Sequence, residues 1–556
     1  MPGGKIQLTV RNAQDKLLTG NPDISFFKSV FKRYTDFQTE SMRLDANTDN
    51  VKLYQSKTSI LKFKINNNNG DLINHLYLNL QMPTIYSDKA SSPTAANHAG
   101  RYEFQWIKRL GEYIIKDCKF IIDGEVIDNL TGEWLHIWSE LTIMSNKWGG
   151  YNEMIGHEGE MFNPKSKSKL DNYPNAVDIN PGDGKFYSHS IRGRRIVIPL
   201  PFWFTHNLAQ AFPTYLLEGQ EIELEITLRP LNELYTLLDQ NIDLDTKRRF
   251  KPSTNSHKIG HFINRKGNFD QSLNDDTVGG AIGINPFLEI GVVYLGGEER
   301  AQLQKYMKQE YLITQVTKKP YKIEIPDNFN TFKHEIGLTL EYPTSKIAFC
   351  ARRSDFESEY LQYENYTNKV SGIDPFAAYN SGVDMNPFEV DRAENSIITT
   401  TTLNNQKFGE NILSAELYFR GIKRFEKQDM SSFSLINNYQ HSIRIPIDGV
   451  YTYSFETQNL FRKYQPNGAC DMSMLMSTDS KNEIIQNNNR QQNRLELTLA
   501  PKITTNGDYH YNFMLFSMNY NILKIGGGRA ELLFNDSIYR DSNHHKSLKT
   551  VRDLID

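Results

Sequence analysis

The sequence predicts an all-β protein of two large domains with long loop insertions and a few short helices. Three observations lead to this prediction. Apolar and polar residues alternate with a period of two wherever the pattern is clear, helical periodicity is scarce, and long polar tracts separate the alternating segments. At 556 residues the chain also exceeds the size at which one hydrophobic core usually stops growing, so two domains are the expected division.

The predicted strands each have one buried and one exposed face. At residues 76–80 every second residue is leucine, and at 221–228 glutamate and threonine alternate with isoleucine and leucine. The second half shows the same pattern at residues 336–340, 415–419, 495–499 and 509–521. Only residues 298–309 and 232–239 have the spacing of modest helices.

Long tracts rich in Asn, Asp, Ser, Gly and Lys connect these strands. They cover approximately residues 84–104, 144–186, 240–284 and 351–408. Loops of this length are uncommon in compact domains and are usually functional. A jelly roll, in which two four-stranded sheets pack face to face, projects its loops at one end and accommodates such insertions. The tract 240–284 lies between the two β-rich halves and is the best candidate for a linker.

The composition argues against several classes of protein. The 63 basic and 66 acidic residues nearly balance, which disfavours a protein that wraps nucleic acid by charge alone. Three cysteines, Cys118, Cys350 and Cys470, are too few for a disulfide scaffold, and we interpret them as buried thiols in a reducing compartment. No apolar stretch of about 18 residues and no signal-peptide core occur, so neither a membrane span nor a secretory route is predicted.

The segment from Thr19 to Phe37 is the most informative part of the chain. It opens with Gly20-Asn21-Pro22, a loop signal, and continues with large rings separated by basic residues. The rings are those of Phe26, Phe27, Phe31, Tyr34 and Phe37. Such rings favour burial, so we interpret the segment as an anchor rather than a catalytic element.

The same segment resembles the N-terminal signature of the major capsid proteins of nucleocytoplasmic large DNA viruses, a family with a double jelly-roll fold. Further segments resemble this family in the expected order: 123–138 and 200–204 in the first half, and 294–316 and 465–473 in the second. The chain departs from the family pattern at 474–476 and in its long loops. The residues that carry the resemblance, and that are our candidates for structure and assembly, are Asn21, Pro22, Phe26, Phe27, Lys28, Phe31, Arg33, Trp134, Trp138, Trp203, Gln465, Pro466 and Gly468.

The resemblance implies two tandem eight-stranded jelly rolls and a structural function without catalysis or cofactor. We expect an N-terminal arm at 1–25, a first jelly roll at 26–230, a linker at 231–286, a second jelly roll at 287–535 and a tail at 536–556. The resemblance also implies a pseudo-hexagonal homotrimer that contacts neighbouring capsomers, penton and minor capsid proteins and an internal membrane. Such a protein belongs to the icosahedral shell of the virion and is assembled in the host cytoplasm, without sequence-specific binding of nucleic acid.

Several residues suggest chemistry that their surroundings do not support. We interpret Trp134 and Trp138 as core, and Gly526-Gly527-Gly528 as a turn, because no nucleotide-binding lysine or helix pattern follows it. His157 and the pair His544-His545 lack the partners of a metal site. Lys28, Lys32 and Arg33 form the one basic cluster of interest, which we interpret as an exposed face rather than a lipid or protein contact.

Two alternatives and one modification remain open at this point. Within the same fold, the chain could be a transient scaffold that shapes a viral membrane. From another class, it could be a carbohydrate-binding or carbohydrate-active β-sandwich, because two carboxylates at a suitable separation can hydrolyse glycosides. Without a secretory route, we interpret the glycosylation sequons at Asn129, Asn365 and Asn535 as chance matches.

Overall fold

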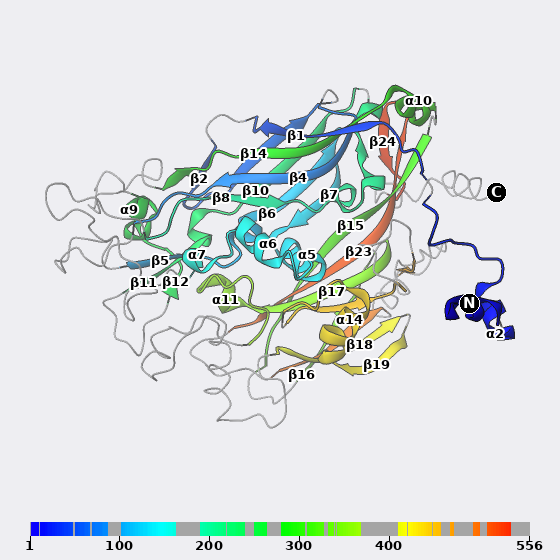
Figure 1. Ribbon diagram of the computed structural model, residues 1–556. Coiled ribbons are helices and arrows are strands. Elements are labelled where there is room, and N and C mark those ends of the chain that lie inside the picture. The colour runs from blue at the N-terminus through cyan, green and yellow to red at the C-terminus, as the bar shows by residue number, and fades with distance from the viewer. Residues whose placement is uncertain are drawn as a thin grey trace, which may run out of the picture.

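The computed structural model shows a β-rich protein whose antiparallel sheets lie in successive layers (Figure 1). It describes residues 2–10, 12–29, 31–47, 51–66, 69–86, 102–162, 190–217, 219–239, 249–263, 280–305, 308–326, 332–338, 340, 342–368, 410–419, 421–447, 449–457, 467–471, 493–500 and 509–534. None of the helices in these ranges is long and apolar enough to cross a membrane.

The first jelly roll consists of two sheets. One contains β1 (Phe37–Asp45), β14 (Phe287–Leu295), β4 (Leu72–Gln81) and β8 (Arg195–Pro199) in that order, with β9 (Phe212–Pro213) also paired to β4. The other contains β3 (Ser59–Ile65), β10 (Ile222–Leu228), β6 (Ile115–Ile122) and β7 (Glu125–Thr131). When the eight main strands are numbered along the chain, the two orders are 1-8-3-6 and 2-7-4-5, the topology of a jelly roll.

The second jelly roll repeats this topology. One sheet contains β15 (Lys308–Ile323), β23 (Tyr511–Gly526), β17 (Pro343–Arg353) and β20 (Tyr451–Ser454), with β21 (Cys470–Asp471) and β24 (Arg529–Leu532) at its margins. The other contains β16 (Phe332–Gly337), β22 (Arg494–Leu499), β18 (Ile412–Phe419) and β19 (Ile422–Asp429). The main strands again follow the orders 1-8-3-6 and 2-7-4-5. The predicted all-β double jelly roll is therefore confirmed.

Shorter elements connect these sheets. Two small sheets pair β12 (Arg249–Phe250) with β11 (Tyr235–Asp239) and β5 (Tyr102–Trp106), and β13 (Ala281–Gly283) with β2 (Lys52–Tyr54). In the described residues the α-helices are α1 (Gly3–Thr9), α2 (Ala13–Thr19), α4 (Leu110–Tyr113), α5 (Gly132–Thr142), α6 (Trp148–Met154), α7 (Gly159–Phe162), α8 (Trp203–His206), α9 (Gly260–Ile263), α10 (Gly297–Lys305), α11 (Ser354–Ser358) and α14 (Asn437–His441). The short 3₁₀ turns are η1 (Leu208–Gln210), η2 (Thr214–Leu216), η3 (Leu231–Glu233) and η5 (Asn255–His257), and η7 (Ser432–Ile436) is a π-helical turn before α14.

Three local features differ from the sequence expectations. The helix expected at 232–239 is wrong, because β11 occupies Tyr235–Asp239 and pairs with β5 instead. Strand β14, placed by the sequence at the start of the second jelly roll, hydrogen-bonds to β1 and β4 of the first. The Trp-bearing segment forms helix α5, which no helical prediction covered, whereas the helix expected at 298–309 is present as α10. The predicted domain boundaries themselves stay a prediction.

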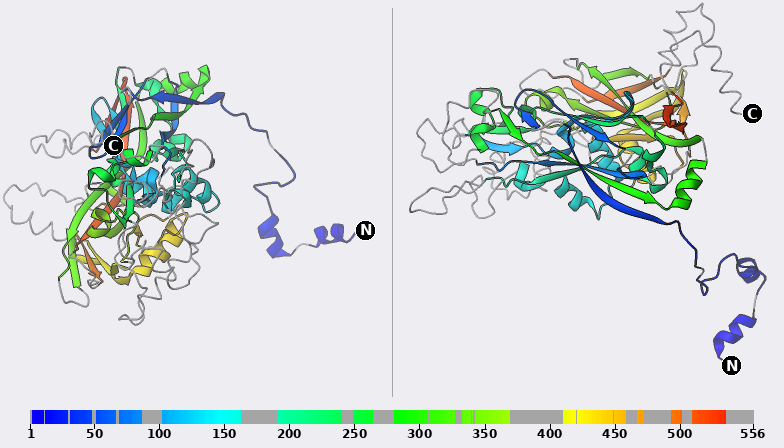
Figure 2. Two further views of the ribbon diagram at one scale, coloured as in Figure 1. Left: turned by 90° about the vertical axis from the view of Figure 1, so that its left-hand side faces the viewer. Right: turned by 90° about the horizontal axis from the view of Figure 1, so that it is seen from above.

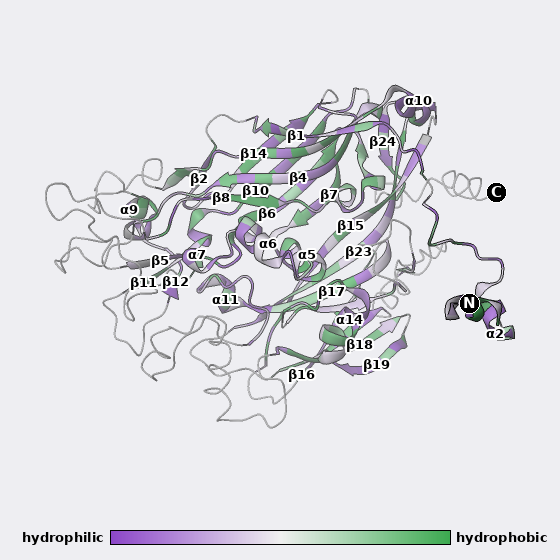
Figure 3. Cartoon of the chain, in the orientation of Figure 1, coloured by the Kyte–Doolittle hydropathy of each residue, from purple (hydrophilic) through white to green (hydrophobic). Residues whose placement is uncertain are grey.

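The strands bury the residues that their alternation selects. In β10 the isoleucines and leucines are buried and the intervening residues half-buried, and Figure 3 shows the resulting stripes along many strands. The buried residues form two hydrophobic clusters. Phe349, Phe513 and Leu515 belong to the core of the second jelly roll, whereas Ala348 and Phe516 join the cluster of the first. The sheet of β15, β23 and β17 thus lies between two cores.

Candidate functional site

Helix α5 lies at the contact between the two jelly rolls. Thr131 caps it, with Oγ1 accepting a hydrogen bond from the Trp134 amide at 3.4 Å. The Trp134 ring is buried and packs 5.7 Å from the ring of Phe516 in β23. The helix therefore packs its aromatic side chain against the second jelly roll, and its acidic residues lie at the same boundary.

The first buried carboxylate of α5 is that of Glu133, which meets cations from both jelly rolls. Arg229 Nη2 of the first lies 2.9 Å from Oε1, and Lys318 Nζ of the second lies 3.0 Å from Oε2. Arg352 of the second lies 3.8 Å away. Burial alone would raise the pKa of Glu133, but Lys318, Arg229 and Arg352 lower it to about 2. The carboxylate is therefore held ionised by charges that both jelly rolls supply.

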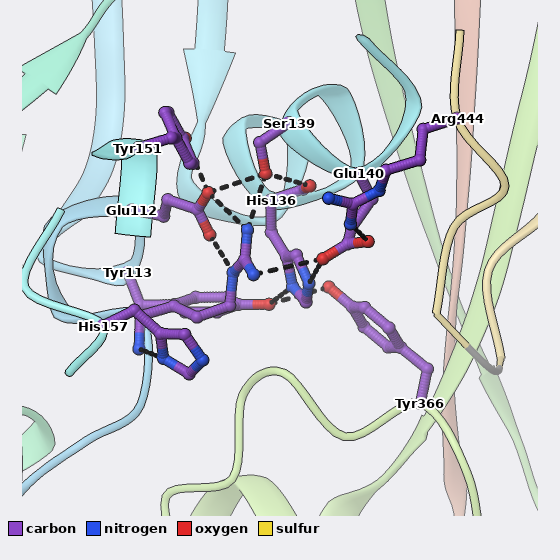
Figure 4. Close-up of polar contacts among 10 residues, drawn as sticks. Glu112, Tyr113, His136, Ser139, Glu140, Tyr151, His157, Tyr366 and Arg444 are labelled. Carbon is purple, nitrogen blue, oxygen red and sulfur yellow. Dashed lines mark hydrogen bonds and ion pairs between the residues drawn. The ribbon is translucent and has the colours of Figure 1, made fainter. Parts of the chain in front are cut away.

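The second buried carboxylate of α5 is that of Glu140 (Figure 4). Arg109 Nη1 of the first jelly roll lies 3.1 Å from its Oε1, and Arg444 of the second pairs with its Oε2. Arg109 is also bound by Glu112, with Nε 2.6 Å from Oε2, and it donates to Ser139 Oγ at 2.7 Å. This cluster joins the jelly rolls through charge-assisted hydrogen bonds, which are stronger than neutral ones.

Uncharged groups extend this cluster. The Tyr113 hydroxyl lies 2.5 Å from His136 Nδ1 and 3.0 Å from the hydroxyl of Tyr366, which comes from the second jelly roll. Burial lowers the pKa of His136 well below its usual range, so the imidazole is neutral. The sequence analysis rejected His157 as a metal ligand. In the structure its Nδ1 accepts a hydrogen bond from the Arg109 amide, and burial lowers its pKa to about 3.

The anchor segment is exposed in the single chain. Figure 2 shows α1 and α2 apart from the sheets, and the chain joins the body only at β1. The rings of Phe26, Phe27 and Phe31 are 89%, 99% and 84% exposed. Asn21, Pro22, Lys28, Lys32 and Arg33 are exposed as well, and Asn21 adopts a positive φ of 48°. The structure thus brings the predicted anchor residues together on an arm, but it does not bury their rings within one chain.

The other predicted residues lie in the body of the molecule. Trp203 is buried in an aromatic group around Phe120, and Trp138 is half-buried and stacks on His206. Gly468 lies close to the backbone of Phe455, where a Cβ would come within 2.4 Å of the carbonyl oxygen. Gln465 and Pro466 lie outside the described residues, as do Asn535 and the pair His544-His545.

The remaining sequence features have structural roles. Asn365 is buried and its Oδ1 accepts from the Thr367 amide and hydroxyl, while Asn129 is half-buried in β7. Gly527 and Gly528 form the predicted turn between β23 and β24, both with positive φ. Cys118 and Cys350 are buried and Cys470 half-buried. Within the described ranges, no group of three or more metal-ligating side chains comes together.

Comparisons with known proteins agree with this architecture. Residues 25–260 match the family model described as "Major capsid protein N-terminus", and residues 299–530 match "Large eukaryotic DNA virus major capsid protein". The fold and the joined halves define a double jelly-roll capsid protein. The chain belongs to the major capsid proteins of large eukaryotic DNA viruses, a structural rather than an enzymatic family.

Individual relatives cover nearly the whole chain. The major capsid protein of Phaeocystis pouchetii virus is 24% identical and covers 96% of this chain and 100% of its own. That of Paramecium bursaria Chlorella virus 1 is 23% identical over 85% of this chain and 86% of its own. The solved structure of VP54 from PBCV-1 shares the fold with a TM-score of 0.59 at 19% identity, covering 92% of this chain and 100% of VP54. The Faustovirus major capsid protein gives 0.57 at 12% identity, covering 93% and 95%.

The interdomain carboxylates were not found by sequence reasoning. Glu133 and Glu140 are seven residues apart on α5, on the same side of the helix, and such spacing is the one local signal that the sequence offered. Their partners Lys318, Arg352 and Arg444 are far away along the chain. A contact of this kind is visible only once both jelly rolls are in place.

Proposed function

We propose that this chain is the unit of a pseudo-hexagonal homotrimeric capsomer in an icosahedral shell. The observation that supports it is the apolar arm. Its large apolar side chains are at least half exposed, and such a concentration of exposed apolar residues in one short segment marks an interaction surface. These side chains are those of Ile6, Leu8, Val10, Leu17, Leu18, Ile24, Phe26, Phe27, Phe31 and Tyr34.

The repeated topology supports the hexagonal outline. Each chain contains two jelly rolls with the same strand orders, so a ring of three chains presents six similar domains. Hexagonal outlines tile a surface, and contacts repeated by symmetry need only a few kinds of interface. We further propose neighbouring capsomers, penton and minor capsid proteins and an internal membrane as partners, and the host cytoplasm as the site of assembly.

Solution mass tests the homotrimer directly. Three chains of 64.3 kDa give about 193 kDa by light scattering. We expect this mass together with six-lobed particles in electron micrographs. A stable monomer at all concentrations tested would overturn the proposal.

A further inference from the structure

The shared topology gives each element of the first jelly roll a counterpart in the second. Helix α5 follows β7, the fifth main strand of the first jelly roll, and η7 with α14 follows β19, the fifth of the second. The sheet β1-β14-β4-β8 corresponds in the same way to β15-β23-β17-β20. A contact made by one set of elements can therefore be compared with the surfaces of the other.

Within the chain, α5 covers one face of the second jelly roll's sheet. Phe516, which contacts Trp134, is directly opposite Lys318 on β15 and Ala348 on β17, so these three side chains share a face. Lys318 on that face holds Glu133 of α5. The other face belongs to the second jelly roll's own core. This sheet is consequently covered on both sides.

The corresponding sheet of the first jelly roll has an outer face that is open toward β1, whereas Asn79 on the same face of β4 is buried. Ser41, Gly291 and His75 lie opposite one another across β1, β14 and β4, and Ser41 and His75 are exposed. In the next row Tyr77 and Glu289 are half-buried. Strand β1 is exposed at seven of its nine residues, including both of its faces near Phe37. Compared with β15 in the second jelly roll, β1 lacks a cover.

The counterpart of α5 also lacks a partner surface. Leu435, Ile436 and Tyr439 of η7 and α14 are 40%, 57% and 80% exposed. Ile445 and Ile447, on the segment that follows, are 41% and 39% exposed. We call these five residues the α14 patch. Figure 1 shows α14 beside β17 and β18, on the side of the molecule away from β1, so the patch and the open sheet face lie apart in one chain.

We propose that the α14 patch of one copy docks on the outer face of the β1-β14-β4-β8 sheet of a second copy. The contact repeats between chains what α5 makes within the chain. Because the two surfaces differ, the contact is heterologous, and a closed ring of three copies satisfies every patch and every sheet. This inference rests on the proposed homotrimer and names the surfaces that form it.

The two contacts differ in their chemistry. Helix α5 brings buried carboxylates to arginine and lysine, whereas residues 430–440 contain no Asp, Glu, Lys or Arg. These residues of the patch bring no charge to the contact, so no ion pair with Glu289 or His75 of the sheet face forms through them. Salt screens exposed charges but not apolar burial, so we expect the trimer to keep its mass in about 1 M salt.

Photo-crosslinking tests the docking geometry in the full chain. We would replace Tyr439 by the photoreactive residue p-benzoylphenylalanine and separate the covalent products by denaturing electrophoresis. The expected result is bands of two and three chains whose crosslinked peptides map to residues 37–45, 72–81 or 287–295. The same residue at Val126, an exposed position near the start of β7, serves as the control and should give no such peptides. Crosslinks from position 439 to other segments would overturn the inference.

A paired substitution separates this inference from the proposed homotrimer. Ile436→Asp with Tyr439→Asp should reduce the solution mass to that of a monomer and leave the circular dichroism spectrum unchanged, because both side chains are exposed within the chain. Val126→Asp is the matched control and should remain trimeric. If the wild type is trimeric and the paired variant is also trimeric, only the assignment of the α14 patch is wrong. If the wild type is monomeric, the homotrimer and the assignment both fail.

Discussion

Removing the charge of Glu133 should lower the free energy of unfolding, because it weakens the contact between the two jelly rolls. The carboxylate is buried, lies 3.0 Å from Lys318 and 2.9 Å from Arg229, and its pKa is lowered from 4.5 to about 2 by these cations and Arg352. At 1.36 kcal/mol for each pKa unit, the difference is about 3 kcal/mol of stability. Because the pKa is lowered on folding, this contribution is present above about pH 4.5 and is lost as the pH falls toward 2.

Thermal unfolding of Glu133→Gln at pH 7 measures this contribution, and we expect a loss of about 3 kcal/mol or more, because the buried cations lose their partner. A double-mutant cycle with Lys318→Met should give a coupling of at least about 1 kcal/mol across the two jelly rolls. Glu225→Gln is the matched control: Glu225 pairs with Lys62 and Lys119 at the surface of one sheet, and its loss should cost no more than about 1 kcal/mol. Equal effects of the two substitutions, or no coupling to Lys318, would refute the reasoning.

Three further predictions concern single positions. Burial raises the pKa of Asp128 to about 7, so its ionisation should lower stability as the pH rises from about 4 to 7; Asp128→Asn should raise the melting temperature more at pH 8 than at pH 5, and equal shifts would contradict this. Phe27→Asp should leave the circular dichroism spectrum of the chain unchanged, because the ring is 99% exposed, yet abolish stable capsomers by light scattering; normal trimers would show that the ring does not anchor. Gly468→Ala should cost about 1–3 kcal/mol in thermal unfolding because of its contact with Phe455, and an unchanged melting temperature would count against that clash.

The strands were predictable because their signal is local. Alternation over a few residues, as at 222–228, reports which side of a strand is buried, and the structure buries those side chains. Helix α5 gave no such signal because it is buried on nearly all sides, so its apolar residues do not form one stripe. At 232–239 the leucine spacing suited a helix, but pairing of β11 with β5 satisfies the backbone across the sheet instead.

The candidate site was predictable only in its exposed part. The rings around Phe26 and Phe27 are conspicuous in the sequence, which is why we interpreted the segment as an anchor. They are not buried within the chain, because the arm has no partner surface there and its rings stay exposed. The contact of Glu133 with Lys318 joins residues 185 positions apart, and no short-range pattern reports such a pairing. The pairing of β14 with β1 and β4 is of the same kind, since these partners are more than 200 residues away along the chain.

The contact of α5 within the chain and the proposed contact of the α14 patch between copies use equivalent surfaces but different chemistry, and this difference suits their different roles. A buried ion pair gains little over a well-packed apolar contact, but loss of one partner is costly, so it suits a contact that forms once as the chain folds and then stays. An apolar patch has no such penalty when it is uncovered, because water tolerates exposed leucine or tyrosine far better than an unpaired buried charge. Before assembly, a single chain can therefore leave the α14 patch exposed to water. It could not leave the buried carboxylates of α5 without their cation partners at the same cost. If this reasoning is correct, exchanging the patch for an acidic helix face should impair assembly even where matching lysines are supplied on the open sheet.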